Sequence, residues 1–282
     1  MKTEKKIVVY YHKGCRDGFV GAGIAKMALK NKAEYVPMPF TYTGFKKLRN
    51  KTIFFIDAVP LLKDFVEIHK SNEVFILDHH PTAAEQFKVH KKGVYNLNYS
   101  GAGLAWKYFF PKKKMPKFVS QVQKSDLWQK QTEGQIGTLA SASLELKSLD
   151  DVPKLIRAFE DKKKLKQYEK EGQKILARES NIVHSAVESS VPIIFEGQKA
   201  RFTYGISALR THIGAALYEA FPGNIAVVVY LDEGRPKVSL RAKVGTKADV
   251  MKIAKKYGGG GHRYSAGFHW HINKPFPWKY KN

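Results

Sequence analysis

The sequence predicts a two-domain α/β protein, in which a parallel sheet with helices on both faces precedes a smaller α/β domain. Three features predict this arrangement. In the first half, short apolar runs alternate with helical patterns, a rhythm that is typical of parallel strands joined by right-handed crossovers. A long, charged segment with helical periodicity covers residues 150–190. After Val191, strand-like runs return, so the sequence indicates a helical connector between two domains.

The predicted domains are residues 1–130 and 191–282, with a helical connector at 131–190. In the first domain, strands are expected at 7–11, 34–38, 53–56 and 74–77, and helices at 18–30, 61–70, 101–110 and 117–124. In the second domain, strands are expected at 192–195, 200–204, 225–231, 237–241 and 264–270, and helices at 207–221 and 247–256. The length of 282 residues suits two domains of ordinary size.

The composition excludes several classes of protein. Hydrophobic residues make up 43% of the chain, which favours a packed core over global disorder. No apolar run is long enough to span a membrane, and the run at residues 7–11 is too short for a signal peptide. The single cysteine, Cys15, excludes an internal disulfide. These features are typical of a soluble, cytoplasmic protein.

The formal net charge of +24 favours a polyanionic partner such as nucleic acid, nucleotides, polyphosphate or an acidic membrane surface. Lys accounts for 40 of the 49 basic residues, so compositional bias is an alternative explanation. The charge is uneven, because the stretch from Arg235 to the last residue holds twelve basic residues and one acid, Asp249. We therefore expect a basic face on the second domain and a short nucleic acid or nucleotide as partner, with no membrane.

Carboxylates and histidines follow three of the predicted strands. His12, Cys15 and Asp17 follow the first, Asp57 follows the third, and Asp78-His79-His80 follows the fourth. Ligands bind at the carboxyl ends of the strands in open parallel sheets. Clustered carboxylates repel one another unless cations lie between them, and carboxylate with imidazole suits Mn²⁺, Fe, Co or Zn²⁺. The pattern predicts one or two divalent ions, with Mn²⁺ the first choice. Alone, a strand-terminal His is often structural, and a strand-terminal Asp often caps a helix.

Most of the chain resembles the DHH phosphoesterase superfamily, in the oligoribonuclease-like branch with a DHH-associated C-terminal domain. The most specific motifs are the Asp-His-His triplet and the glycine-rich run with His262, and shorter ones occur in the family's order. The matching stretches are residues 12–18, 55–57, 77–81, 100–102, 125–128, 239–241 and 258–268.

The resemblance implies a role for each matching residue of the first domain. Asp57 would bridge two metals, His80 would lie near the phosphate, and Asp78 would orient the cluster as the second catalytic residue. The metal ligands would be His12, Cys15, Asp17, Asp57, His79 and Asp126.

Cys15 departs from the family pattern, which has Asp at this position. A thiolate is softer than a carboxylate, so it could favour another ion or leave the first metal weakly bound. Alternatively, Cys15 is a packing residue, and the second site of Asp17, Asp57, His79 and Asp126 carries more of the function.

Four consecutive glycines, residues 258–261, allow backbone N–H groups to approach an anion, because no Cβ stands in the way. A flexible turn before the last strand is the alternative explanation. The resemblance implies that the phosphate or terminal nucleotide of the substrate is held by Arg241, Gly259, Gly260, Gly261 and His262.

The function expected from these residues is hydrolysis of short oligonucleotides, one terminal nucleotide at a time, by a metal-activated hydroxide in a cleft between the domains. Alternatives are a phosphatase of a nucleoside bisphosphate, a cyclic-dinucleotide phosphodiesterase, an exopolyphosphatase, or a degenerate member that binds nucleic acid without cutting it. A monomer and a homodimer are both compatible with the sequence. Aromatic side chains near the motifs, Phe19, Trp128 and Tyr264, are expected in the core rather than as stacking surfaces for bases.

Overall fold

The computed structural model describes residues 6–39, 42, 44–232 and 234–280. The chain forms two compact units, Met1–Ile175 and Leu176–Asn282, and each is described by itself. Helices that follow residue 130 belong to the first unit up to residue 175. The predicted boundaries at 130 and 190 stay a prediction.

A parallel sheet is the centre of the first unit. Within the described residues it has five strands in the order β2-β1-β3-β4-β5, and every neighbouring pair is parallel. Its central strands are almost fully buried, as expected for a sheet that is covered on both faces. The strands are β1 Ile7–His12, β2 Ala33–Met38, β3 Thr52–Ile56, β4 Glu73–Asp78 and β5 Gly93–Tyr95.

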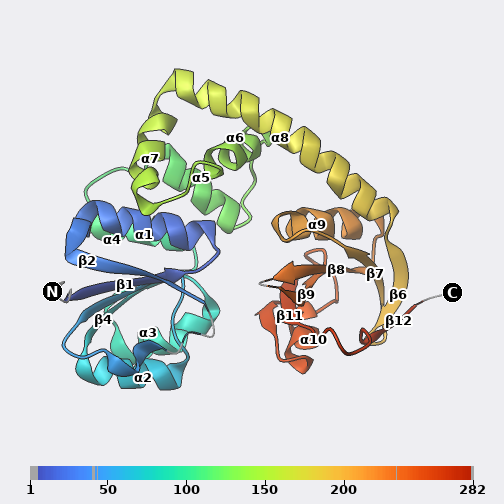
Figure 1. The fold of residues 1–282 in the computed structure, drawn as a ribbon, viewed down its shortest axis with the longest axis horizontal. Coiled ribbons are helices and arrows are strands. Elements are labelled where there is room, and N and C mark those ends of the chain that lie inside the picture. The colour runs from blue at the N-terminus through green and yellow to red at the C-terminus, as the bar shows by residue number, and fades with distance from the viewer. Residues whose placement is uncertain (1–5, 40–41, 43, 233, 281–282) are drawn as a thin grey trace. The chain divides into compact units, whose positions relative to one another are not determined.

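Helices cover both faces of this sheet: α1 and α4 lie on one face, and α2 and α3 on the other (Figure 1). Alternate residues of β1 supply the two cores, because Val9 packs with α1 and α4 whereas Val8 packs with α2. The helices are α1 Arg16–Leu29, α2 Leu62–Ser71, α3 Ala84–His90 and α4 Gly101–Phe109.

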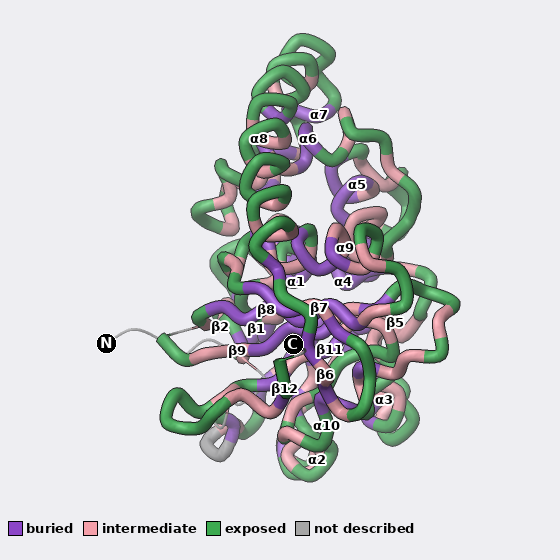
Figure 2. The backbone as a smooth tube through the Cα atoms, turned by 90° about the vertical axis from the view of Figure 1, so that its right-hand side faces the viewer, coloured by how far each residue is buried: buried purple, intermediate pink, exposed green. Residues whose placement is uncertain are grey.

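Further helices complete the first unit and extend the core of α1 and α4. Phe118, Leu139 and Phe159 contribute buried side chains from three of them. The fourth helix, α8, is mostly exposed, and of its described residues only Gly172 is buried. Figure 2 shows the contrast between the exposed α8 and the buried β1. The helices are α5 Lys117–Asp126, α6 Glu133–Ser143, α7 Val152–Glu160 and α8 Lys162–Glu188, which continues into the second unit.

The second unit has a mixed sheet. In its described part, seven strands run in the order β10-β11-β9-β8-β7-β6-β12, with β7 and β8 parallel and the other pairs antiparallel. The helices α9 Arg210–Ala220 and α10 Val250–Lys256 pack on it. The strands are β6 Val191–Phe195, β7 Gln198–Tyr204, β8 Ile225–Asp232, β9 Arg235–Arg241, β10 Gly260–His262, β11 Ser265–His269 and β12 Trp278–Tyr280.

The predicted fold class is confirmed: a parallel sheet with helices on both faces comes first, and an α/β unit follows. The elements that were not predicted are mostly short, such as β5 and β12, which each have three residues. Part of the glycine run forms β10. Among the described helices, none combines the length and the apolar character that crossing a membrane requires.

Candidate metal centre

The predicted site residues of the first unit converge at the carboxyl edge of its sheet. His12 ends β1, Asp57 follows β3 directly, and Asp78 ends β4. Helices supply two further residues, because Asp17 lies in the first turn of α1 and Asp126 is the last residue of α5. The parallel order of the strands therefore gathers residues that lie far apart in the sequence.

Asp57 is at the centre of this cluster. Its side chain is 1% exposed, and its backbone has a φ of +61°, a left-handed conformation that Asp tolerates better than most residues. Asp57 Oδ2 lies 3.4 Å from His12 Nδ1, and Asp57 Oδ1 lies 3.3 Å from His79 Nε2. His79 Nε2 also lies 3.3 Å from Asp126 Oδ2, so one imidazole connects two carboxylates.

Three overlapping groups of these side chains each place their ligand atoms within 4.8 Å of one another. They are His12 with Cys15 and Asp57, Asp57 with His79 and His80, and Asp17 with His79 and Asp126. Asp57 and His79 are shared between groups, which is the arrangement that two neighbouring cations require.

Several of the potential ligand atoms are buried yet make no hydrogen bond of good geometry. They are Oδ2 of Asp17, both carboxylate oxygens of Asp57, Nε2 of His79 and Oδ2 of Asp126. Buried polar atoms are normally paired, because leaving one unpaired costs about 1–3 kcal/mol. Carboxylate oxygens with imidazole nitrogens form a donor set that divalent cations accept. The residues present therefore fit a divalent metal ion.

The charges of the cluster show why a cation would stabilise it. Burial, followed by the negative charges of Asp57 and Asp126, raises the pKa of Asp17 well above its usual range. Burial and Asp57 likewise raise the pKa of Asp126. Burial also acts to raise the pKa of Asp57, but the imidazoles of His12 and His79 outweigh it and hold this pKa below its usual range. Asp57 thus favours the ionised form, whereas Asp17 and Asp126 favour the protonated form.

His80 is held by Asp78 rather than by the other carboxylates. Asp78 Oδ1 accepts a hydrogen bond from the backbone N–H of His80 at 2.7 Å and lies 2.9 Å from its Nδ1. Burial acts to lower the pKa of His80, but Asp78, Asp57 and Asp126 together raise it to about 9. The imidazole is therefore a cation at neutral pH in this arrangement. The fully buried carboxylate of Asp78 fixes its orientation.

Sequence reasoning assigned no role to Ser100 and Gly101, although they belong to one of the short motifs. The Ser100 hydroxyl donates to Asp17 Oδ1 at 2.6 Å and accepts from the N–H of Gly103, so it also caps α4. The N–H of Ala102 donates to the same Asp17 oxygen at 3.1 Å. Oδ1 of Asp17 is thereby occupied, whereas its Oδ2 is buried without a hydrogen bond.

Cys15 lies at the N-cap position of α1 with its thiol in the cluster. Burial, together with the charges of Asp57 and Asp17, raises the pKa of the thiol well above its usual range. A bound cation would act in the opposite direction and favour the thiolate. Both explanations that the sequence left open for Cys15 are thus compatible with its position.

A hollow of about 180 Å³ opens beside the cluster, and the exposed Trp128 lines it. The expectation that Trp128 belongs to the core is therefore wrong. It lies two residues after the last residue of α5, at a left-handed backbone position with a φ of +54°. The residues that line the hollow are Cys15, Arg16, Asp17, Val122, Ser125, Asp126 and Trp128.

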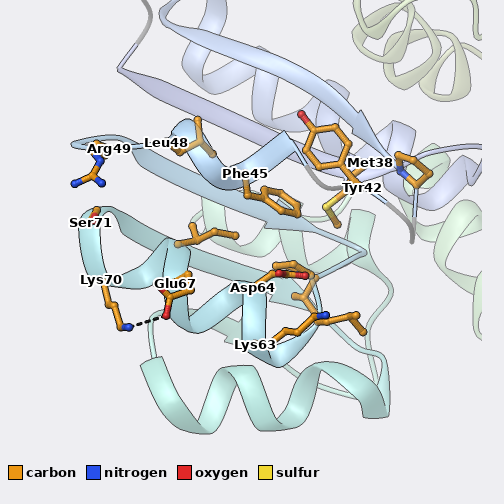
Figure 3. Close-up of a pocket in the computed structure, with 15 residues that line it drawn as sticks. Met38, Tyr42, Phe45, Leu48, Arg49, Lys63, Asp64, Glu67, Lys70 and Ser71 are labelled. Atoms are coloured by element: carbon orange, nitrogen blue, oxygen red, sulfur yellow. Dashed lines mark hydrogen bonds and ion pairs between the residues drawn. The ribbon is translucent and has the colours of Figure 1, made fainter.

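A larger hollow of about 510 Å³ lies beside α2 and contains none of the predicted site residues. Met38, Tyr42 and Phe45 form an apolar wall, and charged side chains of α2 lie opposite (Figure 3). Lys70 and Glu67 form an ion pair of 2.6 Å at its rim. Among the described residues, its acidic side chains belong to none of the three groups that could hold a metal ion, so this hollow is distinct from the candidate centre.

The predicted substrate-binding residues of the second unit lie at one edge of its sheet. Arg241 of β9 pairs with Ser265 of β11, and Ser265 pairs with His262 of β10, so Arg241 and His262 share one row across three strands. Arg241 Nη2 donates to Thr211 Oγ1 at 2.9 Å, and burial, then Arg210, lowers its pKa to about 10.

The glycine run has two different environments in the second unit. The N–H of Gly259, three residues after the end of α10, donates to the carbonyl of Ala254 within that helix at 2.9 Å. Gly260 and Gly261 belong to β10 and pair with β11. Gly261 has a φ of +136°, and a Cβ there would lie 2.5 Å from the Ser265 carbonyl oxygen, so this position requires glycine. The predicted phosphate contact of the run stays a prediction.

Comparisons with known proteins give one relative and several structures with the same fold. No family model matches the chain. An uncharacterized protein of Acanthamoeba polyphaga mimivirus is 30% identical over 298 residues, which cover 92% of this chain and 66% of that protein. The chain thus spans slightly less than two thirds of that relative.

Two solved structures resemble the chain over almost its whole length. An exopolyphosphatase-related protein from Bacteroides fragilis has a TM-score of 0.51 at 10% identity, covering 97% of this chain and 89% of that one. The DHH domain of a protein described as a member of a family of ribosomal proteins has a TM-score of 0.50 at 10% identity, with coverages of 98% and 83%.

Proposed function

Because the chain has the fold of the DHH-domain proteins, we propose that it is a divalent-metal-dependent phosphoesterase that hydrolyses the phosphodiester bonds of short oligonucleotides. One observation carries this proposal. Asp17, Asp57, His79 and Asp126 bring together buried ligand atoms that make no hydrogen bond of good geometry, at the carboxyl edge of a parallel sheet. Such a cluster is unfavourable without a cation and becomes favourable with one.

The proposed metal ligands are His12, Cys15, Asp17, Asp57, His79 and Asp126, with Mn²⁺ as the first choice of ion. A divalent ion supplies a nucleophile at neutral pH by lowering the pKa of water, and it neutralises charge on phosphoryl oxygens. His80, oriented by Asp78, is proposed to donate a hydrogen bond to the phosphate. Arg241 and the residues 259–262 of the second unit are proposed to hold the phosphate or the terminal nucleotide.

A nucleotide chain suits the charge of the protein. The net charge is +24, and the stretch from Arg235 onward holds twelve basic residues against one acid. Clustered positive charge raises the local concentration of polyanionic substrates and accelerates their association. Polyphosphate is also a polyanion, and one structure with the same fold is named as exopolyphosphatase-related. Polyphosphate is therefore the main competing substrate.

The test of this proposal is a substrate panel with the purified full chain. Oligoribonucleotides about two to five residues long, a nucleoside bisphosphate, a cyclic dinucleotide and inorganic polyphosphate are incubated with Mn²⁺, Mg²⁺, Zn²⁺ or a chelator, and products are separated by chromatography. We expect metal-dependent release of single nucleotides from the short oligomers. Phosphate release from polyphosphate alone would overturn the choice of substrate. Nucleic-acid binding with no metal-dependent hydrolysis of any substrate would make the protein a non-catalytic binder.

Replacing Cys15 tests whether its thiol is a metal ligand. Cys15→Asp is expected to preserve or raise hydrolysis, because a carboxylate is a good ligand for hard divalent ions and Asp occupies this position in the family. Cys15→Ala is expected to lower the bound metal, measured by elemental analysis after gel filtration. With Co²⁺ in place of the native ion, the wild type should show near-ultraviolet thiolate-to-metal absorption that Cys15→Ala lacks. Unchanged stoichiometry and absorption would assign Cys15 to packing.

A further inference from the structure

Trp128 is unusual among the tryptophans of the chain, because the residue is 69% exposed. Trp106 and Trp278 are buried, and Trp270 is partly buried. Burying an aromatic side chain is one of the largest favourable contributions to folding, so an indole in solvent forgoes that contribution. A planar aromatic side chain that is largely exposed beside a site is well suited to stack on a planar group of a ligand.

The fold holds this indole next to the metal centre. Asp126 ends α5, and Trp128 follows after a single residue. Trp128 has a φ of +54°, and the N–H of Gln129 donates to the carbonyl of Lys124 at 2.9 Å, so the helix ends in a left-handed cap. A left-handed backbone is uncommon for a bulky residue and persists where the surrounding structure fixes it. One turn of chain therefore places both a metal-binding carboxylate and an exposed indole.

The hollow beside Trp128 combines three kinds of recognition chemistry. Asp17 and Asp126 belong to the metal-binding groups, Arg16 is an exposed cation, and Trp128 is an aromatic surface. A cation and a metal ion both suit a phosphate, whereas the indole suits a nucleobase. Inorganic polyphosphate offers nothing to the indole, but a nucleotide offers a partner to all three.

We propose that Trp128 is a stacking platform for a nucleobase of the substrate, and that it makes the centre selective for phosphate esters that carry a base over inorganic polyphosphate. This inference rests on the proposed phosphoesterase function. It adds a specificity residue of the first unit to the contacts that the second unit is expected to supply.

The kinetic test compares substrates with and without a base. Trp128→Ala is expected to raise the KM for a dinucleotide by on the order of 10-fold with little change in kcat, because stacking acts on bound substrate and transition state alike. Trp128→Phe should restore most of the affinity. Hydrolysis of inorganic tripolyphosphate should change by less than about twofold in both variants. Equal effects on both kinds of substrate, or no effect on the dinucleotide, would overturn the proposal.

A binding test separates this inference from the proposed catalysis. Adenosine 5′-monophosphate and ribose 5-phosphate differ only in the base, and each is titrated against the protein in Mg²⁺ while tryptophan fluorescence is followed. We expect the nucleotide to quench the wild type and the control Trp270→Phe, but to quench Trp128→Phe much less. Ribose 5-phosphate should leave the fluorescence of all three unchanged. If the nucleotide quenches the fluorescence but no substrate is hydrolysed, the stacking role of Trp128 is kept and the phosphoesterase function is rejected. If substrates are hydrolysed without Trp128-dependent quenching, only the stacking role is rejected.

Discussion

Asp57→Asn is expected to lower metal-dependent hydrolysis by on the order of 10³-fold or more. Asp57 is the carboxylate that approaches both His12 and His79, at 3.4 and 3.3 Å, and it takes part in two of the three metal-binding groups. An amide keeps the shape of the side chain but removes the charge and one of the two oxygens. The loss should appear mainly in kcat and in metal affinity, measured with saturating substrate over a range of Mn²⁺ concentrations.

Thermal unfolding provides the control for this variant. In a chelator at neutral pH, Asp57→Asn should melt below the wild-type temperature, because it loses the ionised carboxylate whose pKa His12 and His79 hold below its usual range. Mn²⁺ should stabilise the wild type, by about 2.7 kcal/mol at 100 times its Kd, and stabilise the variant much less. Asp64→Asn, on α2 outside the metal-binding groups, should behave like the wild type in both respects. Full activity in Asp57→Asn would contradict the assignment of the centre.

The strands of the first sheet could be predicted because buried parallel strands consist of short apolar runs in the sequence. Residues 53–56 and 74–77 are such runs, and they match β3 and β4 within one residue at each end. The polar residues that follow them then had to meet at one edge, because parallel strands share their carboxyl ends. The convergence of His12, Asp57 and Asp78 required only the order of elements.

Other features of the centre depend on tertiary contacts that no local pattern encodes. The hydrogen bond from Ser100 to Asp17 joins residues 83 positions apart, through the packing of α4 against α1. The exposure of Trp128 follows from how the chain leaves α5, whereas tryptophans are buried on average. The sequence signal that was present, a Ser before a helical apolar run, is the ordinary signature of an N-cap and did not indicate a second role.

The glycine run shows the same limit in the second unit. Four consecutive glycines indicate a backbone that other residues would not allow. They do not show whether a turn, a close packing contact or a bound anion requires it. In the structure, a Cβ at Gly259 would lie 2.1 Å from the Gly267 carbonyl oxygen, and a Cβ at Gly261 would lie 2.5 Å from the Ser265 carbonyl oxygen, both in β11. Both positions have a structural reason to be glycine, whether or not an anion binds beside them. A phosphate contact therefore has to be established by binding measurements rather than by composition.

Gly101→Ala is expected to lower activity by on the order of 10²-fold and to reduce stability by about 1–3 kcal/mol. A Cβ at Gly101 would lie 2.5 Å from Asp57 Cβ and 2.9 Å from Asp17 Oδ2, closer than real Cβ contacts allow. The backbone of β3 and the start of α4 would have to separate. That shift would strain the Ser100 hydrogen bond to Asp17 and displace two of the clustered carboxylates together.

Gly134→Ala is the matched control, since it adds the same methyl group to the first turn of another helix, α6. The nearest atom to its Cβ would be Oε1 of Glu169, 3.0 Å away at the end of a flexible side chain that can move. Alanine favours helix over glycine by about 0.5–1 kcal/mol, so this variant should be as stable as the wild type or slightly more stable. Denaturant unfolding and Mn²⁺-dependent hydrolysis are measured for both variants. If Gly101→Ala matches Gly134→Ala in both measurements, the close packing of α4 against Asp57 does not control the geometry of the centre.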